Sequence, residues 1–193
     1  MSIPEDFLYY WDHDRNKLLR DEERWVPWFR ERIQRHFLLP LRKILDQMRQ
    51  EEGWALVFAH SLFGGIEAMS SFASNKGTDK EKFIEYCNKY FIPEIHNKNE
   101  LAEAFYSNFR CGLAHGFGIE KGGITFREHD SKVAPIFKNA DCFWVDPSWL
   151  FERFEESVQN FLVRAESEGT EEKGNFIKRF QWFLDRTCVR PSI

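Results

Sequence analysis

Apolar side chains recur at steps of three and four residues through most of this chain, a spacing that places them on one face of a helix. The pattern is clearest in residues 21–52, where the apolar series is Ile33, Phe37, Leu41, Ile44, Leu45 and Met48. Pro27 and Pro40 lie inside this segment, so they must start, kink or split the predicted helix. The sequence therefore predicts a largely helical chain.

The same periodicity predicts further helices at 54–75, 79–91, 100–117, 148–169 and 175–187. Gly77 is expected to end the first of these, and Thr78 and Asn99 are expected to cap the next two. Asp146 and Pro147 form an N-cap and N1 pair for the long helix that follows.

The composition predicts one all-α domain that spans residues 1–193. Hydrophobic residues make up 42% of the chain and aromatic residues 17%, with only 11 Gly and 7 Pro, which excludes disordered, collagen-like and low-complexity classes. No internal repeat or linker divides the chain. Residues 1–20 mix aromatic and charged side chains without a period, and we interpret them as an arm whose Phe7, Tyr10 and Trp11 pack on the main body.

A short region after residue 115 departs from the helical pattern. The stretch GFGIEKGGITF at 116–126 offers a Lys-Gly-Gly turn between short alternating segments, and CFWV at 142–145 is another strand-like run. We therefore expect a small β-hairpin inserted between helices.

Charge and targeting signals favour a cytoplasmic protein. The 27 basic and 31 acidic residues give a net charge of −4, so any nucleic-acid site must be a local patch. The first residues carry acids where a signal peptide needs basic and then apolar residues. Residues 54–73 approach membrane-spanning length, but His60, Glu67 and three serines argue against a span.

The cysteines and the familiar motifs give no sign of a metal or cofactor. The four cysteines are too far apart for a zinc or redox motif, and we interpret them as buried thiols of a reducing compartment: Cys87, Cys111, Cys142 and Cys188. The chain also lacks a P-loop, a GxGxxG after a strand, a GxSxG and an HExxH. We therefore expect neither a bound metal nor a cofactor.

The segment FYSNFRCGLAHGF on helix 100–117 carries the most suggestive pair of side chains. Arg110 can hold a phosphate bidentately, and His115 can move a proton near neutral pH. Phosphodiester cleavage requires both functions. The helix also has one predicted apolar strip, consisting of Leu101, Phe105, Phe109, Gly112 and Leu113.

The motif Arg110-Cys-Gly-Leu-Ala-His115 resembles the R-x4-6-H motif of the HEPN superfamily. The resemblance extends loosely over residues 53–165, through an apolar helix, a Tyr-containing helix, the motif helix, a hairpin and a long helix. It implies a bundle of four to five helices and, in active members, metal-independent cleavage of single-stranded RNA by attack of the ribose 2′-hydroxyl. It also implies a homodimer in which two motifs meet, and a defence or toxin-type effector that a protein antitoxin or regulator could control.

The resemblance implies that Arg110 holds the scissile phosphate and that His115 acts as general acid or base. Cys111 stands where active members usually carry a polar residue, commonly Asn. This departure keeps open an alternative, a degenerate member that binds nucleotides, RNA or a protein without cutting. A third interpretation is a helical adaptor without any ligand.

The spacing of the motif raises a question of geometry. On an ideal helix, five positions separate Arg110 and His115 by about 140°, so the two flank the apolar strip instead of sharing a face. A site shared between two chains would resolve this. Gly112 and Gly116 remove bulk from the helix and would let another backbone or a nucleotide approach.

A polar stripe lies on the otherwise apolar helix 54–75, and its members are His60, Gly64, Glu67, Ser71 and Asn75. An ionised Glu67 needs a partner or water. One hypothesis is that the stripe faces the motif helix, where Glu67 orients Arg110 or His115 with support from His60 and Cys111. The alternative is that the stripe simply faces solvent.

Overall fold

The computed structural model of the protein describes residues 22–77, 79–116, 118–126, 136–139 and 142–187. The predicted arm at 1–20, with Phe7, Tyr10 and Trp11, lies outside the described residues, as does Thr78. Helices make up most of the described chain, which confirms the predicted predominance of α-structure.

A long helical stretch opens the described chain. The 3₁₀ turn η1 (Glu22–Arg24) leads into α2 (Trp25–Ile33), the π-helix η2 (Gln34–Leu38) and α3 (Leu39–Met48). Pro27 lies in the first turn of α2, where a missing N–H leaves no intrahelical bond unmade. The helical path continues through Pro40 without a split. The wider π turn just before it accommodates a residue that cannot donate a backbone hydrogen bond.

The apolar helix α4 (Ala55–Ser74) follows a 3₁₀ turn, η3 (Glu52–Trp54). It ends at Asn75, in agreement with the predicted range 54–75, but the left-handed residue that closes it is Asn75 itself (φ 53°, ψ 30°) and not Gly77. Asparagine is one of the few residues other than glycine that adopts this C-terminal conformation. By length and composition α4 could cross a membrane, but 56% of its most apolar window is buried inside the protein, as in a core helix.

Each of the next two helices continues into a π-helix. α5 (Lys80–Tyr86) runs into η4 (Cys87–Phe91), and α6 (Lys98–Ala104) runs into η5 (Phe105–Cys111) and α7 (Gly112–Gly116). Asp79 caps α5, because its carboxylate accepts a hydrogen bond from the Lys82 backbone at 2.9 Å. The prediction of Asn99 as a cap is wrong. α6 starts at Lys98, and the Asn99 amide oxygen accepts a hydrogen bond from Asn88 instead.

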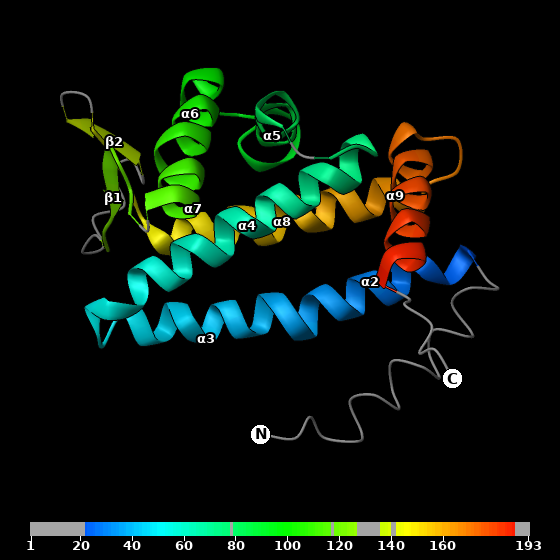
Figure 1. Ribbon diagram of the computed structural model, residues 1–193, viewed down its shortest axis with the longest axis horizontal. Helices are drawn as coiled ribbons and strands as arrows, with labels where there is room; N and C mark the ends of the chain where they lie inside the picture. Colours follow the sequence, from blue (N-terminus) through cyan, green and yellow to red (C-terminus); the bar gives the residue numbers. More distant parts are fainter. Residues whose placement is uncertain (1–21, 78, 117, 127–135, 140–141, 188–193) are drawn as a thin grey trace.

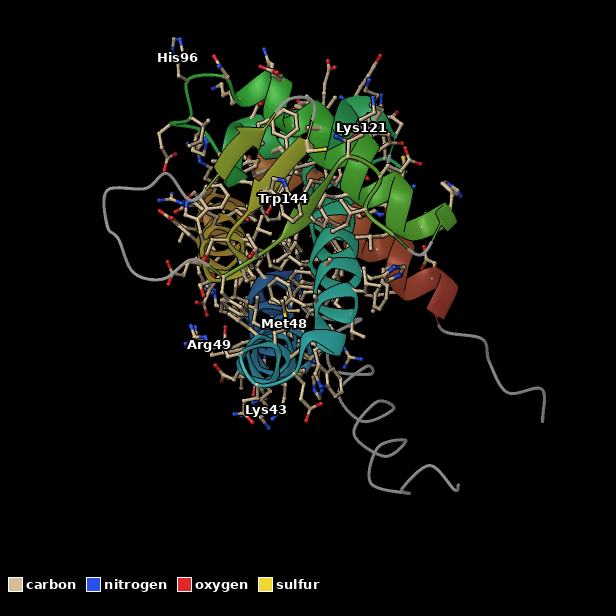
Figure 2. The ribbon with its side chains drawn as sticks, turned by 90° about the vertical axis from the view of Figure 1, so that its left-hand side faces the viewer. Lys43, Met48, Arg49, His96, Lys121 and Trp144 are labelled. Atoms are coloured by element: carbon tan, nitrogen blue, oxygen red, sulfur yellow. The ribbon has the colours of Figure 1, made fainter. Side chains whose placement is uncertain are left out.

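A three-stranded sheet replaces the predicted hairpin. β1 (Gly122–Ile124) pairs in parallel with β3 (Cys142–Val145), and β2 (Ile136–Asn139) pairs antiparallel with β3, so the order is β1-β3-β2. Gly122 belongs to a strand and not to a turn. Its φ is +156°, and a Cβ there would come within 2.0 Å of the Phe143 carbonyl oxygen. Figure 2 views the end of the molecule that carries this sheet.

Two long helices complete the fold. Asp146 caps α8 (Pro147–Glu166) as predicted, with Oδ1 accepting from the backbone N–H groups of Ser148 and Trp149 at 2.8 and 3.1 Å. α9 (Glu171–Thr187) begins four residues before the predicted start. The Thr170 hydroxyl accepts a hydrogen bond from the Lys173 backbone, so threonine provides the start signal.

α4 lies at the centre of the bundle. The α2–α3 stretch, α4 and α8 run lengthwise, α9 stands across one end, and α5 and the motif helix cover one side (Figure 1). α4 contacts α3, α5, α7, α8, α9 and η5. Aromatic rings fill much of the core, with Phe63 5.1 Å from Phe109 and Phe176 stacked on Phe180 at 5.5 Å between ring centroids. The core thus holds the motif helix against α4.

Candidate functional site

The motif helix is one continuous path through α6, η5 and α7. Its predicted apolar strip is confirmed, because Leu101, Phe105, Phe109, Gly112 and Leu113 are all buried. Arg110 and Cys111 lie in the π-helical part, and His115 lies in the α-helical turn that follows. The ideal-helix angle of 140° therefore does not apply between Arg110 and His115. A π-helix is rare, and such turns are found frequently at functional sites.

Glu67 on α4 grips Arg110 on the motif helix with two hydrogen bonds. Arg110 Nε donates to Oε2 at 3.0 Å, and Nη2 donates to Oε1 at 2.6 Å. Both side chains are about three-quarters buried, with exposures of 23% for Arg110 and 26% for Glu67. The predicted approach of Glu67 to the motif helix is thus confirmed. The negative charge of Glu67 on the apolar helix is thus neutralised by Arg110 through two charge-assisted hydrogen bonds.

Tyr106 and Cys111 complete the surroundings of Arg110. The guanidinium carbon lies 5.7 Å from the centroid of the Tyr106 ring. The hydrogen bonds that Arg110 donates to Glu67 raise the pKa of Arg110 above its ordinary value, with a smaller contribution from Cys111. Burial raises the pKa of Tyr106, and the nearby Cys111 adds to this effect. Arg110 therefore remains positively charged, and the Tyr106 side chain beside it remains uncharged.

Sequence reasoning missed Tyr106. It stands four positions before Arg110, and residues at this spacing are neighbours on a helix surface. That spacing, together with the affinity of guanidinium groups for aromatic faces, is the signal that could have found it.

The geometry of the pair leaves part of the guanidinium to other acceptors. Glu67 binds the side edge, made by Nε and Nη2, and does not occupy the end edge made by Nη1 and Nη2. A guanidinium has five N–H donors in a rigid fork, so one carboxylate does not saturate it. Glu67 thus orients Arg110 without using Nη1, and the Cys111 thiol is a further hydrogen-bond partner beside the guanidinium.

His115 is not brought into contact with this cluster. It is exposed in the last turn of α7, and within the described residues no hydrogen bond or ion pair joins it to Arg110, Glu67 or Cys111. His60 is exposed on α4 as well and has no described contact with either motif residue. Among the described residues, no contact therefore supports the predicted role of His60 at the site.

The polar stripe of α4 was expected to face either the motif helix or solvent, and its members differ in this respect. His60 and Gly64 face solvent, and Glu67 faces the motif helix. Ser71 is buried and its hydroxyl accepts a hydrogen bond from Arg179 at 3.2 Å. Asn75 ends the helix. Tertiary contacts thus assign each stripe position separately.

Gly112 admits a backbone, and that backbone belongs to the same chain. A Cβ at Gly112 would lie 2.5 Å from the Gly118 carbonyl oxygen, whereas one at Gly116 would meet nothing within 4 Å. The Glu120 backbone also donates to the Asn108 carbonyl in the π-helix at 3.1 Å. Gly112 therefore holds the following loop against the motif helix and offers no space to a nucleotide. Gly116 remains open and exposed.

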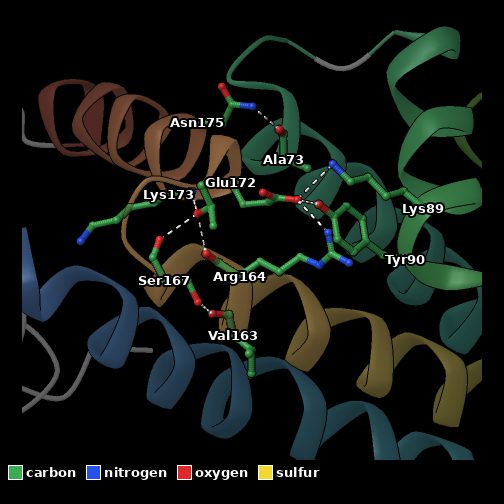
Figure 3. A network of polar contacts seen from close by, with 10 residues as sticks. Ala73, Lys89, Tyr90, Val163, Arg164, Ser167, Glu172, Lys173 and Asn175 are labelled. Atoms are coloured by element: carbon green, nitrogen blue, oxygen red, sulfur yellow. Dashed lines mark hydrogen bonds and ion pairs between the residues drawn. The ribbon is translucent and has the colours of Figure 1, made fainter.

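A second polar cluster, centred on Glu172, was not foreseen from the sequence. Tyr90 Oη donates to its Oε1 at 2.7 Å, and Lys89 and Arg164 approach the same oxygen at 3.0 and 3.4 Å (Figure 3). Burial alone would raise the pKa of Glu172, but the hydrogen bonds from Tyr90 and the backbone, together with Lys89, lower it to about 2. This cluster joins η4, α8 and α9 and has the character of a structural tie.

Across the described ranges, no three His, Cys, Asp or Glu side chains gather as the ligands of a metal would. Comparisons of the chain with protein-family models, with curated proteins and with solved structures found no match. The function must therefore be inferred from the residues and from the geometry of the site.

Proposed function

We propose that this protein is a metal-independent endoribonuclease of HEPN type that cuts single-stranded RNA. The observation that carries the proposal is the Glu67–Arg110 pair. It fixes a permanently charged guanidinium on the motif helix and leaves its end edge to an incoming phosphate. A second motif residue, His115, stands exposed five positions further along the same helix.

In the proposed reaction, the ribose 2′-hydroxyl attacks the adjacent phosphorus and the bond to the 5′-oxygen of the next nucleotide breaks. A base removes the proton from the 2′-hydroxyl, and an acid returns a proton to the departing 5′-oxygen. Arg110 offsets the negative charge that develops on the phosphate oxygens, and His115 acts as acid or base. The products are a 2′,3′-cyclic phosphate and a free 5′-hydroxyl.

The distribution of the two groups supports a homodimer as the active form. His115 has no contact with the Arg110 cluster of its own chain within the described residues, and a two-fold contact presents each group twice. The histidine of one protomer could then serve the arginine of its partner. Light scattering after size exclusion is expected to show twice the 23.1 kDa mass of one chain, and a persistent monomer would contradict this step.

RNA cleavage in EDTA tests the proposal. The wild-type protein should cut single-stranded RNA and leave DNA intact, because DNA lacks the 2′-hydroxyl. His115→Ala should lower the cleavage rate by roughly 10²–10⁴-fold. His96→Ala is the matched control, since His96 is also exposed but lies outside the motif helix (Figure 2). Equal rates for wild type and His115→Ala would overturn the assignment of His115.

Cys111 favours a second candidate, a binding module without catalysis. Its thiol lies beside Arg110 and Tyr106, at the position where the resemblance implies a polar residue in active members. Such a module would bind single-stranded RNA through Arg110 and leave it uncut. Wild-type protein that retains RNA in a filter-binding assay, without cleavage above that of an Arg110→Ala, His115→Ala double variant, would select this candidate.

A further inference from the structure

The π-helical turn η5 brings three chemically active side chains together on the motif helix. In a π-helix the backbone hydrogen bonds join residues five positions apart, so residues at that spacing are neighbours. Tyr106 and Cys111 have this spacing within η5, and Arg110 lies four positions after Tyr106. On an ideal α-helix, Tyr106 and Cys111 would point about 140° apart. In this protein the tyrosine hydroxyl and the thiol are hydrogen-bond partners, and both lie beside Arg110.

Neighbouring elements fix the position of the Tyr106 ring. It packs edge-to-face against Phe83 of α5, with 5.4 Å between the ring centroids and an interplanar angle of 64°. The Arg110 guanidinium carbon lies 5.7 Å from its centroid, and Glu67 of α4 holds that guanidinium at the same time. These contacts limit the positions that the Tyr106 hydroxyl can take relative to Arg110.

The surroundings of the Tyr106 hydroxyl keep it protonated. Burial and Cys111 raise the pKa of Tyr106, Arg110 opposes this effect, and Glu67 adds a smaller rise. The contact from α5 is the uncharged Phe83 ring. The ordinary pKa of tyrosine is about 10, so the hydroxyl carries its proton throughout the neutral range. Tyr106 is only partly buried, so this proton is not sealed in the core.

The proposed cleavage reaction needs two proton transfers, one from the 2′-hydroxyl and one to the departing 5′-oxygen. His115 is exposed, and within the described residues it has no contact with the Arg110 cluster of its own chain. Arg110 stays charged, and Glu67 is the acceptor of its two hydrogen bonds, so neither supplies a proton at neutral pH. The Tyr106 hydroxyl is a protonated donor that lies beside the guanidinium.

We propose that Tyr106 is the general acid of this reaction and that Cys111 orients its hydroxyl. The assignment rests on the proposed ribonuclease activity. His115 of the partner subunit takes the proton of the 2′-hydroxyl, the 2′-oxygen bonds to phosphorus, and the bond from phosphorus to the 5′-oxygen breaks. The proton of Tyr106 Oη passes to that 5′-oxygen. Arg110 offsets the charge that develops on Oη, and water then returns a proton to the tyrosine and accepts the one on the histidine.

A sulfur-substituted linkage tests the role of Tyr106. A strand of 2′-O-methyl RNA with a single unmodified ribonucleotide has one cleavable linkage, and sulfur in place of its 5′-oxygen gives a thiolate that leaves without a proton. On the oxygen substrate in EDTA, Tyr106→Phe should lower the cleavage rate by roughly 10²–10⁴-fold. On the sulfur substrate the same variant should cut as fast as the wild type. A structural role of the hydroxyl would lower both rates alike.

Tyr90→Phe is the matched control, because it removes the same hydroxyl from the Glu172 cluster. It should keep the wild-type ratio of the two rates. Arg110→Ala should stay slow on both substrates, since both carry the phosphate. A Tyr106→Phe variant that keeps the wild-type rate on the oxygen substrate, or that is equally slow on both, would overturn the proposal. Wild-type protein that cuts neither substrate would instead overturn the ribonuclease activity, and this assignment with it.

Two variants of Cys111 test the orientation of the hydroxyl. Cys111→Ala removes the hydrogen-bond partner of Tyr106 and should slow cleavage of the oxygen substrate less than Tyr106→Phe does, with recovery on the sulfur substrate. Cys111→Ser keeps a partner and should restore the rate. If sulfur rescued Cys111→Ala but not Tyr106→Phe, the thiol would be the acid, and the assignment of Tyr106 would be wrong.

Discussion

In two arginine–glutamate pairs of this protein, the carboxylate binds different edges of the guanidinium. Arg30 of α2 binds Glu166 of α8 through its end edge, with Nη1 and Nη2 donating at 2.6 and 3.0 Å. Its Nε is buried and finds no partner among the described residues. Arg110 binds Glu67 through its side edge, and neither of its two hydrogen bonds to Glu67 uses Nη1. The ion pair of Arg30 therefore occupies the end edge of its guanidinium, whereas the ion pair of Arg110 holds the guanidinium by its side edge.

The comparison shows why an ion pair does not by itself exclude a functional arginine. A phosphate takes two parallel hydrogen bonds from the guanidinium fork. At Arg30 the carboxylate already holds the edge that would make them. At Arg110 the carboxylate adds orientation, because a side chain held on one edge loses less freedom when it binds on the other.

Truncation of the two arginines should produce the largest difference. Arg110→Ala is expected to lower RNA cleavage by on the order of 10²-fold or more, the usual cost of removing a group that stabilises transition-state charge. Arg30→Ala should leave cleavage near the wild-type rate, because its end edge is occupied. Initial rates in EDTA on one RNA measure both. A similar loss in the two variants would show that stability, and not phosphate binding, explains the effect.

The charge-conserving variant sharpens the same comparison. Arg110→Lys keeps the positive charge but replaces a fork by a point charge, so it should not restore the full rate. Full activity of Arg110→Lys, measured in the same cleavage assay, would contradict a bidentate contact.

Glu172 differs from Glu67 because its contacts, with Tyr90, Lys89 and Arg164, tie three helical segments together and hold no motif residue. Glu172→Gln should lower the free energy of unfolding at pH 7 by about 1.5–3 kcal/mol, the value of a hydrogen bond to a charged group. Because folding lowers the pKa of Glu172 to about 2, its stabilisation is present above the unfolded-state pKa near 4.5. It is lost as the pH falls toward 2. Urea unfolding from pH 7 to pH 2 should therefore show a flatter profile for Glu172→Gln than for wild type.

The coupling within the two forked pairs should differ by the smallest amount. Double-mutant cycles on exposed pairs give about 0.2–1 kcal/mol. Arg110 and Glu67 are less exposed than Arg30 and Glu166, whose side chains are 33% and 37% exposed, so their coupling should lie toward the top of that range. Salt should reduce the coupling of the Arg30 pair more. Equal coupling and equal salt dependence would remove this energetic distinction.

Local chemistry determined many of the helices and one cap. The apolar strip of the motif helix follows from spacing alone, and Asp146 before Pro147 caps α8 because both residues act on the turn they begin. Strong apolar periodicity likewise identified α4. These features depend on residues a few positions apart, which a sequence pattern records directly.

Contacts between distant segments decided the rest. Glu67 could have faced water or the motif helix. Only the packing of α4 against η5 brings it into contact with Arg110, which lies 43 positions later in the sequence. Gly122 looked like a turn, but its pairing with Phe143 makes it a strand. Gly112 looked open to a ligand, but the loop at 118–120 covers it. The sequence by itself determined helices, one apolar core and a candidate arginine and histidine. Tertiary structure alone decided which edge of that arginine binds Glu67, because hydrogen-bond geometry depends on the positions of both partners.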